Sequence, residues 1–260
     1  MENSKVSRVV KGGSRMATID AKGVYYRQLN KQIKDLVAQG NDEIVLNNVN
    51  GHRYIGDGLD SNVKLIINGT PGNDMAAFTN GVEIIVNGNG QDGIANTMND
   101  GKLVIRGHAG DALGYSMRGG EIYVKGRVGY RVGIHMKGYK DKQPTIIVGG
   151  TAGDFFGEYM AGGRLILLGL EREEGKSIIG NHVAVGMHGG VIYVRGEVEA
   201  YKVGLEVEVL PIDEADREEL KEYLADYCKE FDLDLSEVMN AQFSKLIPVS
   251  SRPYGNMYAY

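Results

Sequence analysis

The sequence predicts an all-β fold, a single-stranded right-handed parallel β-helix of about seven to eight coils. The first observation behind this prediction is a repeat of short aliphatic segments, such as KLIING and EIIVNG, that end in glycine. The repeats follow one another at 19 residues wherever no insertion interrupts them, and a fixed period near this length is typical of a solenoid. The strand-ending glycines are Gly69, Gly88, Gly107, Gly126, Gly150, Gly169 and Gly196.

The second observation is a pair of aliphatic columns within the repeat. Side chains alternate between the two faces of a strand, so the residues two and four places before the glycine face the same way. These positions hold only Val, Ile and Leu, which suit a buried pleated surface, and they predict the core face of every coil. The columns are Leu65, Ile84, Leu103, Ile122, Ile146, Leu165 and Ile192, and Ile67, Val86, Ile105, Val124, Val148, Leu167 and Val194.

The length of the repeat also predicts the hand of the coil. A left-handed hexapeptide helix needs a period built from sixes, and 19 residues do not divide in that way. The period therefore favours the right-handed form, which is the usual hand of parallel crossovers. Two longer steps, of 24 and 27 residues, predict loop insertions before Gly150 and Gly196.

Changes of pattern divide the chain into three segments. Residues 1–42 precede the repeat and are predicted to form an N-terminal arm and a capping helix. The apolar spacing from Tyr25 to Leu36 is helical, and Gly40 ends it. A solenoid needs its open apolar end covered, and this helix is placed to do so. Residues 43–210 hold the coils, of which the first is irregular.

The third segment, residues 211–260, is predicted to form a C-terminal helix and an extended tail. Acidic residues open the helix, and Leu220, Leu224 and Tyr227 lie on one face. A tail this rich in aromatic residues is expected to wrap its own rod or to dock on a neighbour. Its tyrosines are Tyr254, Tyr258 and Tyr260.

One column on the outward face of the strands is apolar, although a solvated face would be polar. Its members lie three places before each glycine, and their neighbours five places before it are mostly polar or charged. An apolar stripe along the whole rod indicates that something covers it, which we expect to be a helix of this chain, a partner chain, or both. The stripe, our candidate partner contact, consists of Ile66, Ile85, Val104, Tyr123, Ile147, Ile166 and Tyr193.

The patterns in the sequence predict no catalytic, cofactor-binding or metal-binding residue. Asp92, Asp111 and Asp154 share a column after the glycine corners; stacked carboxylates could cleave sugars, but such residues more often cap a turn through a local hydrogen bond. The histidines occupy different slots of the repeat, so no column of metal ligands forms. Five methionines share one slot, from Met98 to Met187, and predict stacked core fillers rather than a soft-metal site.

Two other motifs give only weak functional interpretations. GNGQDG at Gly88–Gly93 fits the dinucleotide-binding fingerprint, but no helical pattern follows it. Cys228 lies among acidic residues, a poor setting for a thiolate nucleophile.

Composition narrows the class of protein further. A chain of 260 residues suits one solenoid domain with end structures, and its net charge of −5 argues against nucleic-acid binding. No apolar run is long enough to cross a membrane, and no signal peptide is recognisable. The single cysteine excludes an internal disulfide and indicates a reducing, cytoplasmic setting.

The repeated corners GHAGDALG, GRVGYRVG and GTAGDFFG, with paired glycines before the strands, carry a family resemblance. They resemble the GXGXG domain, the C-terminal right-handed β-helix of the glutamate synthase large subunit. The segments NGHRYIGDGL, IDAKGVYYRQLNKQI and FSKLIPV are similar to the flanks of that domain, so the resemblance covers roughly residues 18–250. Because the chain holds only this domain, it resembles a stand-alone subunit of a split enzyme.

The resemblance implies a structural subunit whose partner chains do the chemistry. Glutaminase-domain and FMN-barrel polypeptides would be its partners, and FMN, an iron–sulfur cluster and NAD(P)H would belong to those chains. The residues agree: Met1 and Glu2 stand where a glutaminase of that class needs a cysteine, and one cysteine cannot hold a cluster. The resemblance leaves open whether the rod also forms a homo-oligomer.

Two alternatives remain at this point. The β-helical subunit of formylmethanofuran dehydrogenase shares the repeat, and RGHAGDALGYSMRGGEIYVKG fits it well. The second alternative is a carbohydrate-active β-helix that uses the Asp column. It would be an enzyme by itself, whereas the two subunit interpretations place the chemistry in partner chains.

Overall fold

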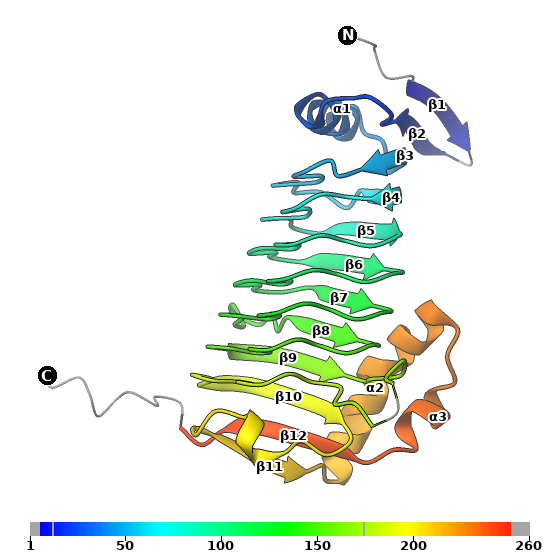
Figure 1. The fold of residues 1–260 in the computed structure, drawn as a ribbon. Coiled ribbons are helices and arrows are strands. Elements are labelled where there is room, and N and C mark those ends of the chain that lie inside the picture. The colour runs from blue at the N-terminus through cyan, green and yellow to red at the C-terminus, as the bar shows by residue number, and fades with distance from the viewer. Residues whose placement is uncertain (1–5, 12, 174, 251–260) are drawn as a thin grey trace, which may run out of the picture.

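A computed structural model describes residues 6–11, 13–173 and 175–250 of the chain. One sheet of 12 strands runs the length of a rod, as Figure 1 shows, in the order β1 to β10, then β12, then β11. The strands β2 to β10 pair in parallel with their neighbours in sequence, which is the pairing of a parallel β-helix. The predicted all-β parallel β-helix is therefore confirmed.

The strands lie where the repeat predicts them, and each ends close to its glycine. Six turns separate β4 from β10, slightly fewer than the seven to eight coils expected. The parallel strands are β2 (Ser14–Asp20), β3 (Glu43–Asn50), β4 (Lys64–Thr70), β5 (Val82–Asn87), β6 (Gly101–Ile105), β7 (Glu121–Val124), β8 (Thr145–Val148), β9 (Ala161–Leu167) and β10 (Gly189–Arg195).

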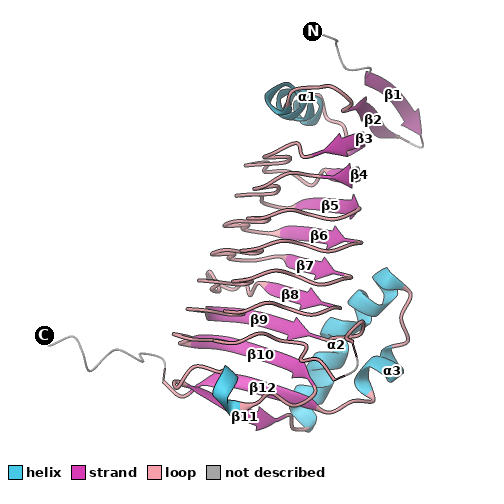
Figure 2. Cartoon of the chain, viewed as in Figure 1, coloured by secondary structure: helices cyan, strands magenta, loops and turns pink. Residues whose placement is uncertain are grey.

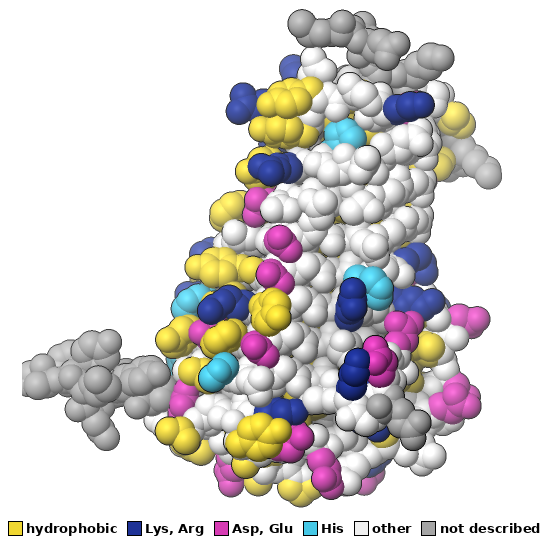
Figure 3. Space-filling model, in the orientation of Figure 1, with side chains coloured by type: hydrophobic (Ala, Val, Ile, Leu, Met, Phe, Trp, Pro, Cys, Tyr) yellow, Lys and Arg dark blue, Asp and Glu magenta, His cyan; other side chains and the backbone are white. Residues whose placement is uncertain are grey.

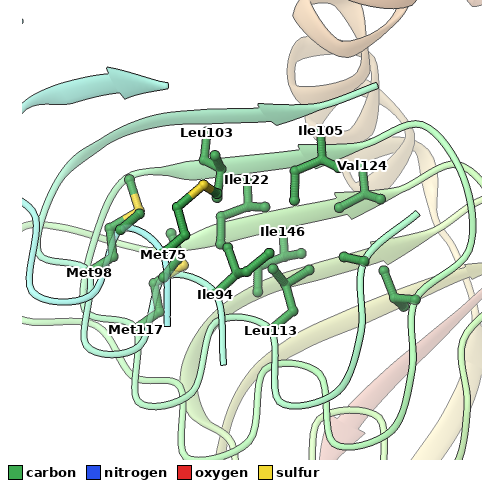
Figure 4. Close-up of a cluster of buried hydrophobic side chains, with 14 of the residues drawn as sticks. Met75, Ile94, Met98, Leu103, Ile105, Leu113, Met117, Ile122, Val124 and Ile146 are labelled. Atoms are coloured by element: carbon green, nitrogen blue, oxygen red, sulfur yellow. The ribbon is translucent and has the colours of Figure 1, made fainter. Parts of the chain in front are cut away.

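The two aliphatic columns form the core of the rod in perfect register. Leu65 on β4 pairs with Ile84 on β5, which pairs with Leu103 on β6, and the series continues to Ile192 on β10. Every member of both columns is at most 1% exposed. Figure 4 shows several of them inside the coil, with Met98 and Met117 at one side of the same buried cluster. The methionine column is buried from Met98 to Met187, so it fills the core as predicted.

The N-terminal end of the rod is closed by α1 (Tyr26–Ala38). Leu29, Ile33 and Leu36 on this helix are buried against the core cluster, which confirms the predicted capping helix. The sheet begins earlier than the expected boundary at residue 43, because β2 already pairs with β3 and β1 (Val6–Lys11) pairs antiparallel with β2.

The C-terminal end is closed by elements that return to the sheet (Figure 2). The chain continues through a short 3-10 helix (Ala200–Lys202), β11 (Val207–Pro211), α2 (Glu214–Phe231), α3 (Leu235–Met239) and β12 (Phe243–Pro248). β12 lies between β10 and β11 and is antiparallel to both. Part of the segment expected to be an extended tail is thus a strand of the sheet. Within the described residues, none of the helices has the length and apolar character needed to span a bilayer.

Candidate docking surfaces

Most of the outward stripe is covered by the chain's own helix α2. Five of its seven residues are at most 2% exposed, and they form one hydrophobic cluster with the apolar faces of α2 and α3 and with Phe243 of β12. Figure 1 shows α2 lying against the strands of the C-terminal half of the rod. These five residues are therefore unavailable to a partner while α2 is in place. They are Val104, Tyr123, Ile147, Ile166 and Tyr193.

The sequence of α2 explains why it forms and stops where it does. Asp213 is the N-cap, and its side chain and that of Asp216 form a reciprocal capping box. Asp232 at the C-cap takes the left-handed conformation, which ends the helix. The apolar residues Leu220, Leu224 and others on one face then meet the stripe.

Polar contacts fix the position of α2 on the sheet. The Tyr193 phenol donates to Asp216 at 2.9 Å, and the Lys245 ammonium lies 2.6 Å from the same carboxylate. Burial disfavours the charged carboxylate, but Lys245 and the other donors outweigh it and hold the pKa of Asp216 below its usual value. Arg106 pairs with Glu230 at 2.6 Å near the other end of the helix.

Among the described residues, the part of the stripe on β4 and β5 is covered less completely. Ile66 and Ile85 are half-buried, although Ile85 packs against the edge of the α2 cluster. Val45 on β3 pairs in register with Ile66 and extends the apolar column by one strand. Lys64 and Glu83 pair at 2.9 Å along one flank. A partly exposed apolar strip, bounded by polar groups, is thus left on the face of β3 to β5.

A ladder of asparagines bounds the other flank of this strip. Asn87 donates its amide N–H to Asn68, and Asn68 donates to Asn47, each at 2.8 Å. Because the side chains satisfy one another between turns, this flank is rigid and neutral. Of the seven stripe residues, Ile66 and Ile85 are the ones that stay partly exposed, and Val45 adds a third partly exposed residue to the same strip. The other suggested contact, the tail with Tyr254, Tyr258 and Tyr260, lies outside the described residues.

The acidic column after the glycine corners is a structural ladder. Asp92 accepts a hydrogen bond from the backbone N–H of Asp111 at 2.8 Å, and Asp111 accepts from the N–H of Tyr130 at 2.9 Å. Asp154 accepts from the N–H of Asn181 in the same way. The expected local cap is wrong in one respect, because each bond joins one turn to the next instead of closing its own turn.

The corners of the coil hold a feature that the repeat pattern did not indicate. Bulky side chains occupy corner positions with φ between 52° and 63°, including Arg131, Phe155 and Tyr159. The left-handed region costs a residue with a side chain about 1–2 kcal/mol, and glycine usually fills it. Gly93 does so at the slot equivalent to that of Arg131 and Phe155. The missed signal was this contrast: large residues in a slot where another repeat has glycine.

These bulky corner residues, together with neighbouring rings such as Tyr115, form two stacks along the edge of the rod. In the first, the Arg131 guanidinium lies 4.4 Å from the ring centre of Phe155, which stacks on His182 at 4.9 Å. In the second, the His135 ring contacts Tyr115 at 5.8 Å and stacks on Tyr159 at 5.2 Å. We call these five rings and one guanidinium the corner stacks.

The corner stacks are open to solvent. Their members are exposed or half-buried, and Tyr130 beside them is 52% exposed. Figure 3 shows hydrophobic, histidine and basic side chains gathered along one edge of the rod, beside acidic ones. Exposed Tyr, Phe and Arg side chains are typical of binding hot spots.

The remaining motifs have structural roles. The His52 ring is buried between the backbone of Asn50 and the Val24 carbonyl, and it ties the first coil to the cap. His108 accepts the N–H of Arg127 in the next turn. The described residues include no group of three or more His, Cys, Asp or Glu side chains that could hold a metal ion. Burial raises the pKa of the Cys228 thiol, so this cysteine is a poor nucleophile.

The dinucleotide-like GNGQDG segment does not form a phosphate-binding turn before a helix. It leaves the end of β5 and enters a corner, and the next regular element is β6. Gly88 is needed for a close approach, because a Cβ there would lie 2.4 Å from the Gly69 carbonyl oxygen of the previous turn. A Cβ on Gly93 would likewise lie 2.6 Å from the Asp74 carboxylate of the previous turn, so these two glycines serve the stacking of turns.

Comparison with known proteins gives two findings. Residues 28–250 match the GXGXG motif family, which covers both the coils and the helices that close the rod. The chain is also 42% identical over 255 residues to the uncharacterized protein MJ1350 of Methanocaldococcus jannaschii, across 95% of this chain and 97% of that protein. The chain therefore belongs to the GXGXG motif family, the family of the glutamate synthase C-terminal domain.

Proposed function

We propose that this chain is a structural and docking subunit of a split glutamate synthase. In that complex, partner chains convert glutamine and 2-oxoglutarate into two molecules of glutamate with a reduced cofactor. The observation that carries the proposal is the family match over residues 28–250. The hydrogen bonds at the corners support a structural function. Carboxylates such as Asp92 and Asp111 accept backbone N–H groups of the next turn and so join the turns of the rod.

The physical role of the subunit is to hold two partners in a fixed relation. Parallel strands lie about 4.8 Å apart, so the six turns from β4 to β10 span about 29 Å. The turns are joined by the sheet and by side-chain ladders, which makes the rod stiff over that length. A glutaminase chain and an FMN-barrel chain, which carries the FMN and the iron–sulfur cluster, can thus be kept in register for the transfer of ammonia.

The uncovered strip on β3 to β5 is the contact we assign to a partner. Ile66 and Ile85 are half-buried in this chain and gain from further burial, whereas the rest of the stripe is already covered. The polar flanks, Lys64 with Glu83 on one side and Asn68 on the other, supply a hydrophilic rim. An apolar centre with a polar rim is the usual arrangement of a specific protein interface.

The test is affinity purification of the tagged chain from its own cells, followed by mass spectrometry of what is retained. A glutaminase-like chain with an FMN-barrel chain is the expected result. Subunits of a molybdenum or tungsten enzyme would instead support the formylmethanofuran dehydrogenase alternative. A chain that is recovered alone, at any salt concentration, would contradict the docking function.

A point variant makes the same experiment specific to the surface. Ile85→Lys places a charge in the strip and is expected to reduce recovery of the partners at least tenfold. Leu205→Lys is the matched control, because Leu205 is fully exposed near the other end of the rod and the variant adds the same charge. Equal recovery with both variants would remove the strip from the interface.

A further inference from the structure

The coil does not require large rings at its corners. Phe155, Tyr159 and His135 hold left-handed backbone with φ of 63°, 52° and 55°, and their rings are exposed or half-buried. A corner that had only to stack would be served by glycine or a small residue, as at Gly93 and Ala112. The feature that distinguishes this edge is the stacking of exposed rings, to which a further aromatic side chain can add.

The described chain ends beside these stacks. β12 runs antiparallel to β10, so its last residues lie at the edge where β10 begins. The Val249 N–H donates to the Glu206 carbonyl at 2.9 Å, and the Glu206 carboxylate accepts the N–H of Gly186 in the corner before β10. Glu206 thus joins the end of β12 to the corner.

Gly186 in turn lies under the second stack. A Cβ built on Gly186 would be 2.3 Å from Cδ1 of Tyr159, so the Tyr159 ring lies directly over this glycine. A contiguous path therefore leads from Val249 through Glu206 and Gly186 to the ring of Tyr159. Residues that follow Ser250 start within reach of both stacks.

The sequence after Ser250 has the matching chemistry and length. It is SRPYGNMYAY, ten residues with three tyrosines, one proline and one arginine. Ten extended residues reach about 33 Å. The stacks extend from the corner before β10 to the corner before β7, which is three turn spacings or about 14 Å. Tyrosine rings favour stacked or edge-on contacts with other aromatic rings.

We propose that the corner stacks are the docking site of this chain's own C-terminal segment, residues 251–260. Tyr254, Tyr258 and Tyr260 add rings to the stacks of Phe155 and Tyr159 and cover the exposed edge of the last turns. The tether favours docking within one molecule, because a short linker gives an effective concentration on the order of 1 mM. This inference does not depend on the identity of the partner chains.

Hydrogen–deuterium exchange of the full chain tests the proposal. Docking with an intrinsic dissociation constant near 0.1 mM, set against the tethered concentration, slows exchange of the 254–260 amides about tenfold. The reference is the free peptide SRPYGNMYAY under the same conditions. Exchange at the same rate in the full chain and in the free peptide would overturn the proposal.

Variants locate the site without unfolding it. Tyr159→Asn and Phe155→Asn each remove a ring from a stack, and asparagine tolerates the left-handed backbone of these positions. Both are expected to return the 254–260 amides to the free-peptide rate. Phe78→Asn is the matched control, because Phe78 is 58% exposed with φ of 59° and lies in the corner before β5, far from the stacks.

Two outcomes would decide against docking within one molecule. Protection that persists in both Tyr159→Asn and Phe155→Asn would place the segment elsewhere. Protection that disappears on dilution, with a dimer in light scattering, would assign the stacks to the segment of a second copy. Slow exchange of the β10 amides in every variant serves as the internal check that the rod is intact.

Discussion

The phenol of Tyr227 on α2 donates a hydrogen bond of 3.0 Å to the backbone carbonyl of Val124 on β7. The same carbonyl accepts the N–H of Gly149 at 2.8 Å, so the helix and the next turn of the coil meet at one oxygen. Burial raises the pKa of Tyr227, which keeps the phenol protonated as a donor. This contact fixes where α2 lies on the outward face.

Gly149→Ala is expected to displace α2. A Cβ at this position would lie 2.2 Å from the Tyr227 oxygen and 2.3 Å from the Lys125 carbonyl oxygen, so the helix has to move. Overpacking of this kind costs about 1–3 kcal/mol, whereas Tyr227→Phe, which leaves Val124 its Gly149 bond, costs about 1 kcal/mol. Urea unfolding measures the free energy of unfolding of both variants. If Gly149→Ala lowers it no more than Tyr227→Phe does, Gly149 is not a steric requirement.

The two parts of the stripe predict unequal losses of stability when a charge is introduced. Ile147 is fully buried under α2, so Ile147→Lys buries an unpaired ammonium and costs about 3 kcal/mol or more. Ile85 is half-buried at the edge, where a lysine stem can lie on the surface with its charge in water, so Ile85→Lys costs below about 1 kcal/mol. Thermal unfolding of the two purified variants compares their stabilities. A similar loss of stability in both would mean that α2 does not cover Ile147 in solution.

Asp57 makes the stability of the rod depend on pH. Its partial burial, helped by the nearby Asp74, raises its pKa to about 7, although it accepts the N–H of Ala77 at 3.0 Å. A carboxyl whose pKa is raised by folding contributes stability that is fully present below about pH 4 and is lost as the pH rises through about 7.

Asp57→Asn removes this dependence, because the amide oxygen still accepts the Ala77 N–H and carries no charge. Relative to the unmodified chain, the variant is expected to gain more stability at pH 8 than at pH 5. Urea unfolding at the two pH values is the measurement. If the variant and the unmodified chain differ in free energy of unfolding by the same amount at pH 5 and at pH 8, the raised pKa of Asp57 is contradicted.

Asp111 distinguishes a ladder from a catalytic carboxylate. Asp111→Asn keeps an oxygen that accepts the Tyr130 N–H, so it is expected to change stability by less than about 0.5 kcal/mol. Asp111→Ala removes the acceptor and is expected to cost about 1 kcal/mol. Calorimetry on the two variants makes the comparison. A sugar-cleaving activity of the isolated chain that Asp111→Asn abolished would reverse this interpretation.

The coil could be predicted from local sequence patterns. Leu65, Ile84 and Leu103 occupy one column because the 19-residue period sets which residues become neighbours, and the two-residue alternation sets which face they share. Both periods are local properties of the chain. The capping helix was predictable for the same reason, since the spacing of Leu29, Ile33 and Leu36 needs no knowledge of distant contacts.

What covers the outward face, and which side chains meet at the corners, depends on contacts between distant parts of the chain. The apolar stripe required a cover, but α2 and a partner satisfy that requirement equally, and the choice at Tyr123 depends on contacts with Tyr227, 104 residues away. β12 could not be predicted as a strand of the sheet, because its short segment ends in proline and its pairing partners, β10 and β11, are known only from the structure. The stack of Phe155 on His182 could not be predicted either, because the insertion between their repeats obscures that the two residues occupy equivalent positions. Local periodicity specifies a coil, whereas non-local packing selects among surfaces that have the same local pattern.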